Sequence, residues 1–416
     1  MRKLLAVCTF LIMGASFAFS AGIALGGRFM GIAQALGNTE TGVGDTRKEP
    51  WTQWTDDMRL TFWLTNDSNT AGAGVRLTGN VWNNPAIGVN YFQAWWQPTP
   101  MFYFCLGKFN EMRKYNPEPL KLSWSIINTD AYDMKAIQFA PWDAYQGVGP
   151  INDNIYTDLK AQGDKIGMQF SFIPMDNLHF TLVWNGFDYN SEFNGANASL
   201  KNALWDRMGA NVSYTNDAGG EASVFFTNKL YNYSSPDYAN TPDATARMKA
   251  ENRRLSFMYT QQILNPLYAE ATLMLPFADN GSMPFMGMGL GFGYKVNSDF
   301  NINARAAAEI SFLDEHETFD MAGKLISGHN TKIGFDLVPT WLLNWSLKLY
   351  VPIGYAWDLD AKLQGWSICP YIMKDAGWVS FWVGFRIWND NTLTFQKPNG
   401  DPSVSWAVPV GLMLSF

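Results

Sequence analysis

Cysteine and histidine are scarce in this 416-residue chain, and beyond its first 20 residues it has no long apolar run. A chain of this length with three cysteines (Cys8, Cys105 and Cys369) is not a small disulfide scaffold. One Cys105–Cys369 bridge would fit, but their wide separation favours two free thiols. Because a transmembrane helix needs roughly 18–20 consecutive apolar residues, the sequence predicts no such helix after residue 20.

The few candidate catalytic groups argue against an enzyme. The histidines are His179, His316 and His329, and none belongs to a visible set of nucleophile, base and orienting group. His316 lies in the acidic stretch 314–317, which is typical of a solvated patch. The glycines at 289, 291 and 293 alternate along a strand-like segment with no following helix, so they fail the structural test for a nucleotide-binding loop. We expect no catalytic residue, no metal and no cofactor.

The N-terminus has the pattern of a secretory signal peptide. Arg2 and Lys3 precede a short apolar run over 4–17, and Ala18-Phe19-Ser20 supplies the small residues of a cleavage site. We therefore divide the chain into a signal peptide at 1–20 and a β-barrel at 21–416. The mature part keeps 28 basic and 37 acidic residues, a net charge of −9, whereas nucleic-acid-binding proteins are usually basic.

Apolar residues are frequent but dispersed. They make up 47% of the chain, with 18 Trp, 17 Tyr and 29 Phe, and Trp and Tyr accumulate at membrane interfaces. Many segments alternate apolar and other residues over about ten positions, for example 58–65, 286–294, 300–310 and 379–387. A soluble β-sandwich also alternates, but its strands usually have five to six residues. Strands that cross lipid must close into a barrel, because every backbone polar group has to be paired.

The last strand carries the strongest signal. An alternating face ends at the C-terminal Phe, and its residues are Trp406, Val408, Val410, Leu412, Leu414 and Phe416. This strand resembles the final strand of bacterial outer-membrane β-barrel proteins. The resemblance implies an outer-membrane location in a Gram-negative (diderm) bacterium, contact with outer-membrane lipid, and recognition by the barrel-assembly machinery.

Turn residues predict the topology. Pro, Asn, Asp and Gly clusters mark eight short turns, at 66–70, 97–100, 174–177, 216–220, 264–266, 297–299, 338–340 and 374–377. Nine other connections alternate with them, at 32–56, 83–86, 110–163, 188–204, 230–251, 277–284, 313–328, 356–363 and 389–402. Short periplasmic turns and longer outer loops are typical of outer-membrane barrels. We predict an all-β, antiparallel up-and-down transmembrane β-barrel of about 18 strands, with a range of 16–20.

A barrel of this size can hold an aqueous channel. The alternation predicts basic residues that face the lumen as pore-wall candidates, namely Arg28, Arg59, Arg76, Arg207, Arg254, Arg305, Lys332, Lys348 and Arg386. Inward acids are fewer, at Asp57, Glu270, Glu309 and Asp336. Two interpretations remain open: a basic ladder on the pore wall, or charges that pair with one another across strands.

The third outer loop, 110–163, is the longest connection. Its acidic residues are candidates for a constriction: Glu111, Glu118, Asp130, Asp133, Asp143, Asp153 and Asp158. The layout resembles that of general bacterial porins, whose third loop folds into the barrel and opposes acids to a basic wall. An outward surface loop or an extra hairpin is the alternative, since long loops are either functional or disordered.

Together these features predict an outer-membrane porin-type channel for passive diffusion of small polar solutes. The porin resemblance also implies a homotrimer as a candidate assembly. Trp63, Trp378, Trp382 and Trp388 could stack on sugar rings, so a saccharide-selective channel is one alternative, although such residues also form interface girdles. A surface adhesin or host-interaction barrel without an open pore is another, suggested by the Tyr- and Asn-rich loop 230–251.

Overall fold

The computed structural model describes residues 22–37, 51–54, 58–80, 86–108, 166–187, 208–228, 253–264, 266–277, 283, 285–312, 331–344, 346–359, 363–389 and 404–415. Within these ranges all regular structure is β-strand. The segments are β1 Gly22–Gly37, β2 Trp51–Trp54, β3 Met58–Thr65, β4 Ala71–Asn80, β5 Ala86–Thr99, β6 Phe102–Lys108, β7 Ile166–Met175, β8 Leu178–Phe187, β9 Met208–Thr215, β10 Glu221–Asn228, β11 Arg253–Leu264, β12 Leu267–Phe277, β13 Phe285–Lys295, β14 Phe300–Ser311, β15 Lys332–Asn344, β16 Leu347–Tyr350, β17 Ile353–Asp358, β18 Leu363–Ile368, β19 Tyr371–Asp375, β20 Val379–Gly384, β21 Arg386–Asn389 and β22 Val404–Ser415.

The 22 described segments form 18 strands. β2 and β3 both pair with β1, and β16 and β17 both pair with β15. β18 and β19 form one strand, because they pair with β17 and β16, which are two parts of the same strand. β20 and β21 form another, because both pair with β22. Merging these four pairs leaves 18 strands, which confirms the predicted number for the part of the chain that the structure describes.

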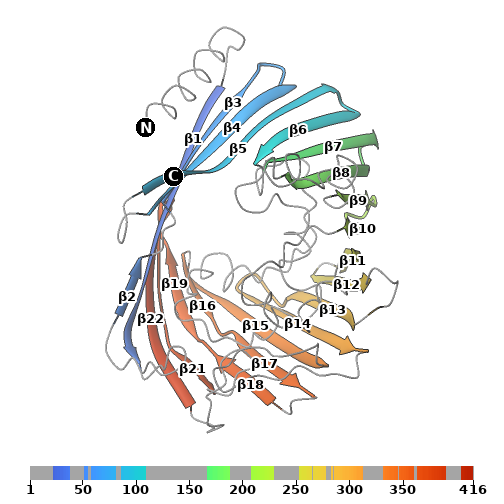
Figure 1. Ribbon diagram of the computed structural model, residues 1–416. Helices are drawn as coiled ribbons and strands as arrows, with labels where there is room; N and C mark the ends of the chain where they lie inside the picture. The colour runs from blue at the N-terminus through green and yellow to red at the C-terminus, as the bar shows by residue number, and fades with distance from the viewer. Residues whose placement is uncertain are drawn as a thin grey trace, which may run out of the picture.

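The sheet closes on itself. Every strand pairs antiparallel with the strand before and after it in the sequence, and β22 pairs with β1 over nine positions from Arg28↔Ser415 to Gly37↔Ala407. Figure 1 shows the resulting ring of strands, with blue β1 beside red β22. Such a barrel has no unpaired edge strand, so it satisfies the backbone pairing that a membrane demands.

The register fixes the dimensions of the barrel. Following paired residues once around from β1 back to β1 displaces the position along the strand by about 22 residues, which corresponds to a strand tilt of about 40°. With 18 strands about 4.8 Å apart at this tilt, the backbone ring has a radius of about 18 Å. The tilt is typical of outer-membrane barrels.

The connections follow the predicted alternation, but the turns predicted at 97–100, 174–177 and 374–377 begin two or three residues too early, because β5, β7 and β19 run to Thr99, Met175 and Asp375. Two further predictions need a larger correction. Within the described ranges, short turns lie at 66–70, 100–101, 176–177, 216–220, 296–299 and 376–378, and turn residues also stand at Pro266 and Ser346. The turn predicted at Val338-Pro339-Thr340 is wrong, because these residues lie inside β15 and pair with Asn301–Asn303 on β14. The outer connection predicted at 32–56 is too long, because β1 continues to Gly37 and β2 occupies 51–54.

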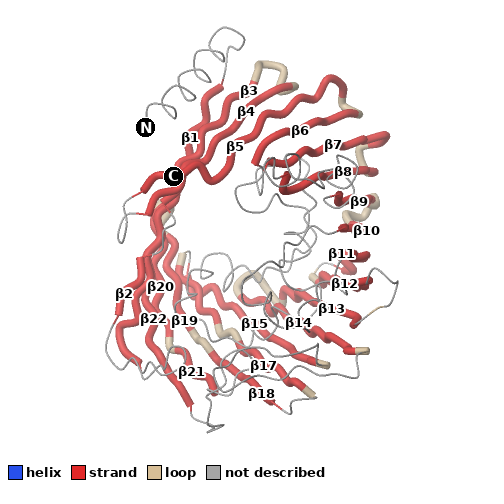
Figure 2. Tube along the Cα trace, in the orientation of Figure 1, coloured by secondary structure: helices blue, strands red, loops and turns tan. Residues whose placement is uncertain are grey.

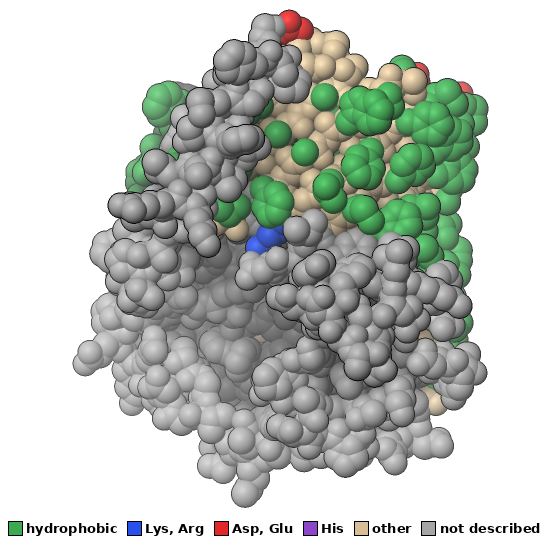
Figure 3. All heavy atoms as spheres, turned by 45° about the horizontal axis from the view of Figure 1, so that its top comes forward, with side chains coloured by type: hydrophobic (Ala, Val, Ile, Leu, Met, Phe, Trp, Pro, Cys, Tyr) green, Lys and Arg blue, Asp and Glu red, His purple; other side chains and the backbone are tan. Residues whose placement is uncertain are grey.

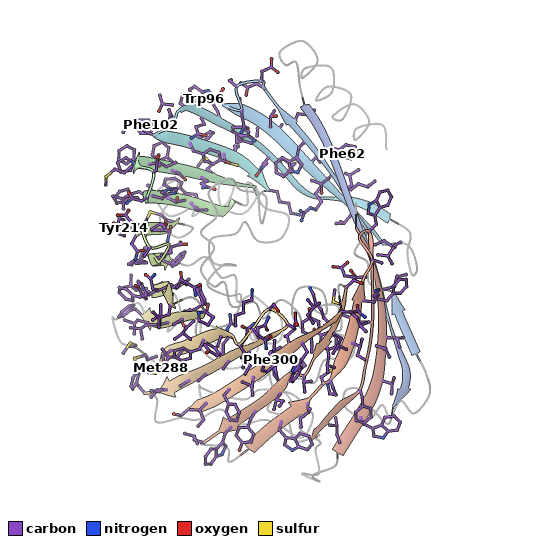
Figure 4. All side chains as sticks on the ribbon, turned by 180° about the vertical axis from the view of Figure 1, so that it is seen from behind. Phe62, Trp96, Phe102, Tyr214, Met288 and Phe300 are labelled. Atoms are coloured by element: carbon purple, nitrogen blue, oxygen red, sulfur yellow. The ribbon has the colours of Figure 1, made fainter. Side chains whose placement is uncertain are left out.

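Apolar side chains cover the outside of the barrel. In β6 the pattern alternates strictly: Phe102, Phe104 and Leu106 are exposed, whereas Tyr103 and Cys105 are fully buried. Figure 3 shows the apolar side chains spread over the wall, and in Figure 4 the labelled Trp96, Phe102 and Tyr214 lie on the outer side of the ring. A soluble protein places such residues inside; this distribution and the closed sheet are those of an outer-membrane β-barrel.

The C-terminal strand fits this exterior. Val410, Leu412 and Leu414 pair with Val383, Phe381 and Val379, of which Val383 and Phe381 are about half exposed. The alternating residues therefore share the outward face. Phe416 lies outside the described residues, as does the predicted signal peptide. Among the residues that the structure describes, no helix is long and apolar enough to cross a membrane.

Candidate functional site: the inner wall of the barrel

Every buried side chain that the structure describes lies on the inward face, as its alternation with exposed neighbours shows. Most of the polar ones are uncharged: Gln93, Gln97, Gln169, Ser171, Thr181, Asn211, Ser223, Ser256, Thr260, Thr272, Thr340 and Ser380. The described part of the wall is therefore rich in amide and hydroxyl groups, particularly from β5 to β12. Sequence reasoning concentrated on charge and missed these residues, although their alternation with apolar residues was visible.

Several of these groups are hydrogen-bonded to each other along the wall. The Gln169 amide donates to the Ser171 hydroxyl at 3.0 Å, and the Ser171 and Thr181 hydroxyls lie 3.0 Å apart across β7 and β8. The Asn211 amide donates to the Val224 carbonyl at 3.3 Å. Because an unpaired polar group is costly when buried, this network stabilises the inward face of β7–β10.

One buried ion pair crosses an entire strand. Arg305 on β14 lies 2.9 Å from Glu270 on β12, and both side chains are less than 5% exposed. Their strands are separated by β13, where Gly291 is the register partner of both residues. Strands two apart are about 10 Å from each other; because Gly291 has no side chain, Glu270 and Arg305 can reach across the inner face and meet.

This ion pair bears on the predicted basic ladder. For Arg305 the geometry supports pairing across strands, because the Glu270 carboxylate neutralises the guanidinium. Arg76 is half-buried on the inward face, and its Nε donates to Thr61 at 3.3 Å. Lys348 is half-buried and two positions from the inward Tyr350. The side chains of Arg28, Arg59, Arg207, Arg254, Lys332 and Arg386 lie outside the described set, so the ladder stays a prediction.

Inward aromatic residues pack against the wall. Trp95 stacks on Tyr103 with ring centroids 6.1 Å apart, and Tyr350 stacks on Tyr371 at 4.8 Å. Trp382, one of the predicted lumen residues, is inward but only 6% exposed, because its indole lies over Gly411 on β22.

The other tryptophans proposed as sugar platforms are placed differently. Trp63 is on the inward face, because the residue before it, Phe62, is exposed on the outward face. The register partner of Trp63 on β4 is Gly74. Trp378 lies in a short turn and is 76% exposed, a position typical of an interface girdle. The Trp388 side chain is not among those described. Sequence reasoning missed Trp95 and Tyr103, whose inward orientation follows from the exposed Trp96 and Phe104 beside them.

The reactive residue types are dispersed. Cys105 and Cys369 are not joined by a disulfide, in agreement with the expected pair of thiols, and the Cys105 thiol is 3.6 Å from the Gln93 amide oxygen. His179 contacts the backbone carbonyl of Asp176 at a short turn. Within the described ranges no three His, Cys, Asp or Glu side chains form a group that could hold a metal ion. His316 and His329 lie outside these ranges, and so do the seven acidic residues of the loop 110–163.

Comparisons with known proteins give a fold likeness only. No family model matches the chain, and no curated protein matches it. Among solved structures, the outer membrane channel DcaP of Acinetobacter baumannii is 11% identical, with 95% of this chain and 97% of that chain covered and a TM-score of 0.48. An anion-selective porin from Comamonas acidovorans is 11% identical, with 95% of this chain and 100% of that chain covered and a TM-score of 0.48. OmpT of Vibrio cholerae is 8% identical, with 96% of this chain and 99% of that chain covered and a TM-score of 0.46. At such low values the fold assignment rests on the strand pairing of the chain itself.

Proposed function

We propose that this protein is an outer-membrane, porin-type channel that passes small polar solutes by passive diffusion. The observation that carries the proposal is the closed 18-stranded barrel with apolar residues outside and polar residues inside. A barrel of about eight strands is filled by its own side chains, whereas 16–18 strands leave room for water. With a backbone radius of about 18 Å, the two opposite walls are too far apart for side chains alone to fill the space.

A constriction by the third outer loop, residues 110–163, is the second part of the proposal. The support comes from the sequence of this loop, which is the longest connection and carries seven acidic residues that could oppose basic residues of the wall. A loop this long in a compact domain is usually either functional or disordered.

The inner wall also bears on solute selectivity. Glu270 and Arg305 are the only charged side chains among the buried polar residues that the structure describes, and they neutralise each other. Lining charge is one of the main determinants of selectivity, so we expect weak ion selectivity from this sector. The many hydroxyl and amide groups favour uncharged hydroxylated solutes, which keeps a saccharide-selective channel as the second candidate.

The decisive experiment is single-channel recording of refolded residues 21–416 in a planar bilayer. Large, stable conductance steps are the expected result, and a demonstrably folded barrel without conductance would overturn the proposal. Replacing residues 112–160 by a short Gly/Asn turn should increase the step size if the loop constricts the pore. Lys348→Glu should shift the reversal potential towards cations, while Lys374→Glu, on the outward face, should not.

The remaining partners belong to the same proposal. The outward face is suited to outer-membrane lipid, and the alternating C-terminal strand is the segment on which recognition by the barrel-assembly machinery would depend. A homotrimer is compatible with the exposed apolar wall. Analytical ultracentrifugation of the refolded protein in detergent tests it, with a single species of three chains as the supporting outcome.

A further inference from the structure

Proline interrupts several neighbouring strands at one level of the barrel wall. Pro339 lies inside the continuous β15, Pro352 lies in the gap between β16 and β17, and Pro370 lies between β18 and β19. Phe385 separates β20 from β21 at the same level. Figure 2 shows the breaks as tan pieces within the red strands of this sector. Proline inside a sheet is normally confined to edge strands or bulges, and this barrel sheet has no edge.

These interruptions are not bulges, because the register is the same on both sides of each break. Thr340 pairs with Tyr350 and Leu337 with Ile353, a step of three residues on both strands. Tyr350↔Tyr371 and Ile353↔Ile368 are again three residues apart on each strand. The pairs Tyr371↔Gly384 and Ile368↔Ile387 repeat the pattern. No residue is inserted, so the breaks have the prolines as their cause.

The hydrogen bonds at the breaks run in one direction only. Val351 N–H donates to the Pro339 carbonyl at 3.0 Å, Cys369 N–H to Pro352 at 2.9 Å, and Phe385 N–H to Pro370 at 2.8 Å. In an antiparallel sheet two residues paired in this way exchange two bonds. Proline has no N–H and cannot return the second. Three consecutive strand pairs therefore each lose one ladder bond along a single line across the wall.

We propose that this line is a hinge in the barrel wall. It divides the sector into a half next to the short turns, formed by β16, β19 and β20, and a half beyond it, formed by β17, β18 and β21. Each half keeps a continuous ladder, so bending concentrates where the ladder bonds are missing. This hinge is a property of the barrel and stands whether or not the barrel conducts.

The half next to the short turns is held together on its inner face. The Tyr350 and Tyr371 rings stack across β16 and β19 at 4.8 Å, and Trp382 on β20 covers Gly411 on β22. These side chains point inward within a few residues of the hinge. Bending along the proline line therefore moves a connected aromatic surface towards or away from the barrel axis. If the barrel is a channel, as proposed above, this motion changes its width.

Hydrogen exchange of the refolded barrel in nanodiscs, followed by mass spectrometry, tests the hinge without depending on conductance. Peptides that span the breaks in β16–β21 should exchange at least about tenfold faster than peptides of the uninterrupted β13 and β14, because local opening follows missing ladder bonds. Equal exchange in the two sectors of the wild-type protein would overturn the proposal, even if no variant can be folded.

Variants sharpen the test. Pro352→Ala with Pro370→Ala restores two N–H groups and should slow exchange across the breaks by about tenfold. Pro276→Ala, in β12 and outside this sector, is the matched control and should leave β16–β21 unchanged. Unaltered exchange in a folded double variant would refute the role of the prolines. In planar bilayers, the double variant should close at least about threefold less often than the control, if conductance is present.

Discussion

The ion pair that spans β13 offers the sharpest test of the inner wall. Arg305→Met removes one partner and leaves the Glu270 carboxylate, itself less than 5% exposed, without its guanidinium. Breaking a buried pair in this way costs about 3–5 kcal/mol, whereas replacing both partners by apolar residues is often nearly neutral. We expect Arg305→Met to lower the free energy of unfolding by about 3 kcal/mol. The double variant Glu270→Leu/Arg305→Met should recover most of that loss.

Urea unfolding of the barrel in lipid vesicles, followed by tryptophan fluorescence, measures these differences. Lys348→Met is the matched control, because this inward lysine is half-buried, and it should change stability by less than about 1 kcal/mol. A double-mutant cycle then isolates the coupling between Glu270 and Arg305. A coupling energy near zero, or a loss for Arg305→Met no larger than the control, would refute the argument that the two side chains meet across Gly291.

Other features of the wall give further predictions. Leu106→Arg places a charge on the lipid-facing side of β6 and should destabilise the barrel by about 2–4 kcal/mol in vesicles; an unchanged urea midpoint would show that this face does not contact lipid. Gly411→Ala should displace the Trp382 indole, seen as a red shift and stronger quenching of tryptophan fluorescence by acrylamide, and identical spectra would contradict the contact. In the folded protein a maleimide should modify the half-exposed Cys369 and spare the fully buried Cys105, with both reacting in denaturant; equal rates in the folded state would disprove the inward burial of Cys105.

Much of this fold can be predicted from the sequence because two local signals agree. Alternation with a period of two residues sets the inward and outward faces, as on β6, where Phe104 is exposed and Cys105 buried. Clusters of Asn, Asp and Gly set the short turns, and the turn at 216–220 is placed correctly because Asn216 and Gly219 suit it. With faces and turns fixed, the number of strands follows.

The errors in predicted turns and strand ends occur where pairing with another strand overrides what the local sequence favours. Pro339 is read as a turn residue, since proline is a strong breaker, but the neighbouring strands hold it inside β15. The end of β1 is misplaced because Gly37 and the residues before it lack strong strand formers. The pairing of β1 with β22 extends the strand to Gly37.

The inner wall is the least predictable part. Alternation places Glu270 and Arg305 on the inner face, but only the register of three strands shows that Gly291 lies between them. Likewise, the sequence places Trp382 towards the lumen without showing that Gly411 allows its indole to lie against the wall. Such contacts depend on residues that are far apart in the sequence and cannot be read from local patterns.

The central claim is that this chain forms a barrel whose strands turn alternate residues to lipid. Single cysteines introduced in turn at positions 102, 103, 104, 105 and 106 of a variant lacking the two native thiols, and labelled with a fluorophore before refolding, test it directly. Brominated lipid should quench the labels at 102, 104 and 106 and spare those at 103 and 105. Quenching that does not alternate, or that is absent at all five positions in a folded protein, would contradict the account.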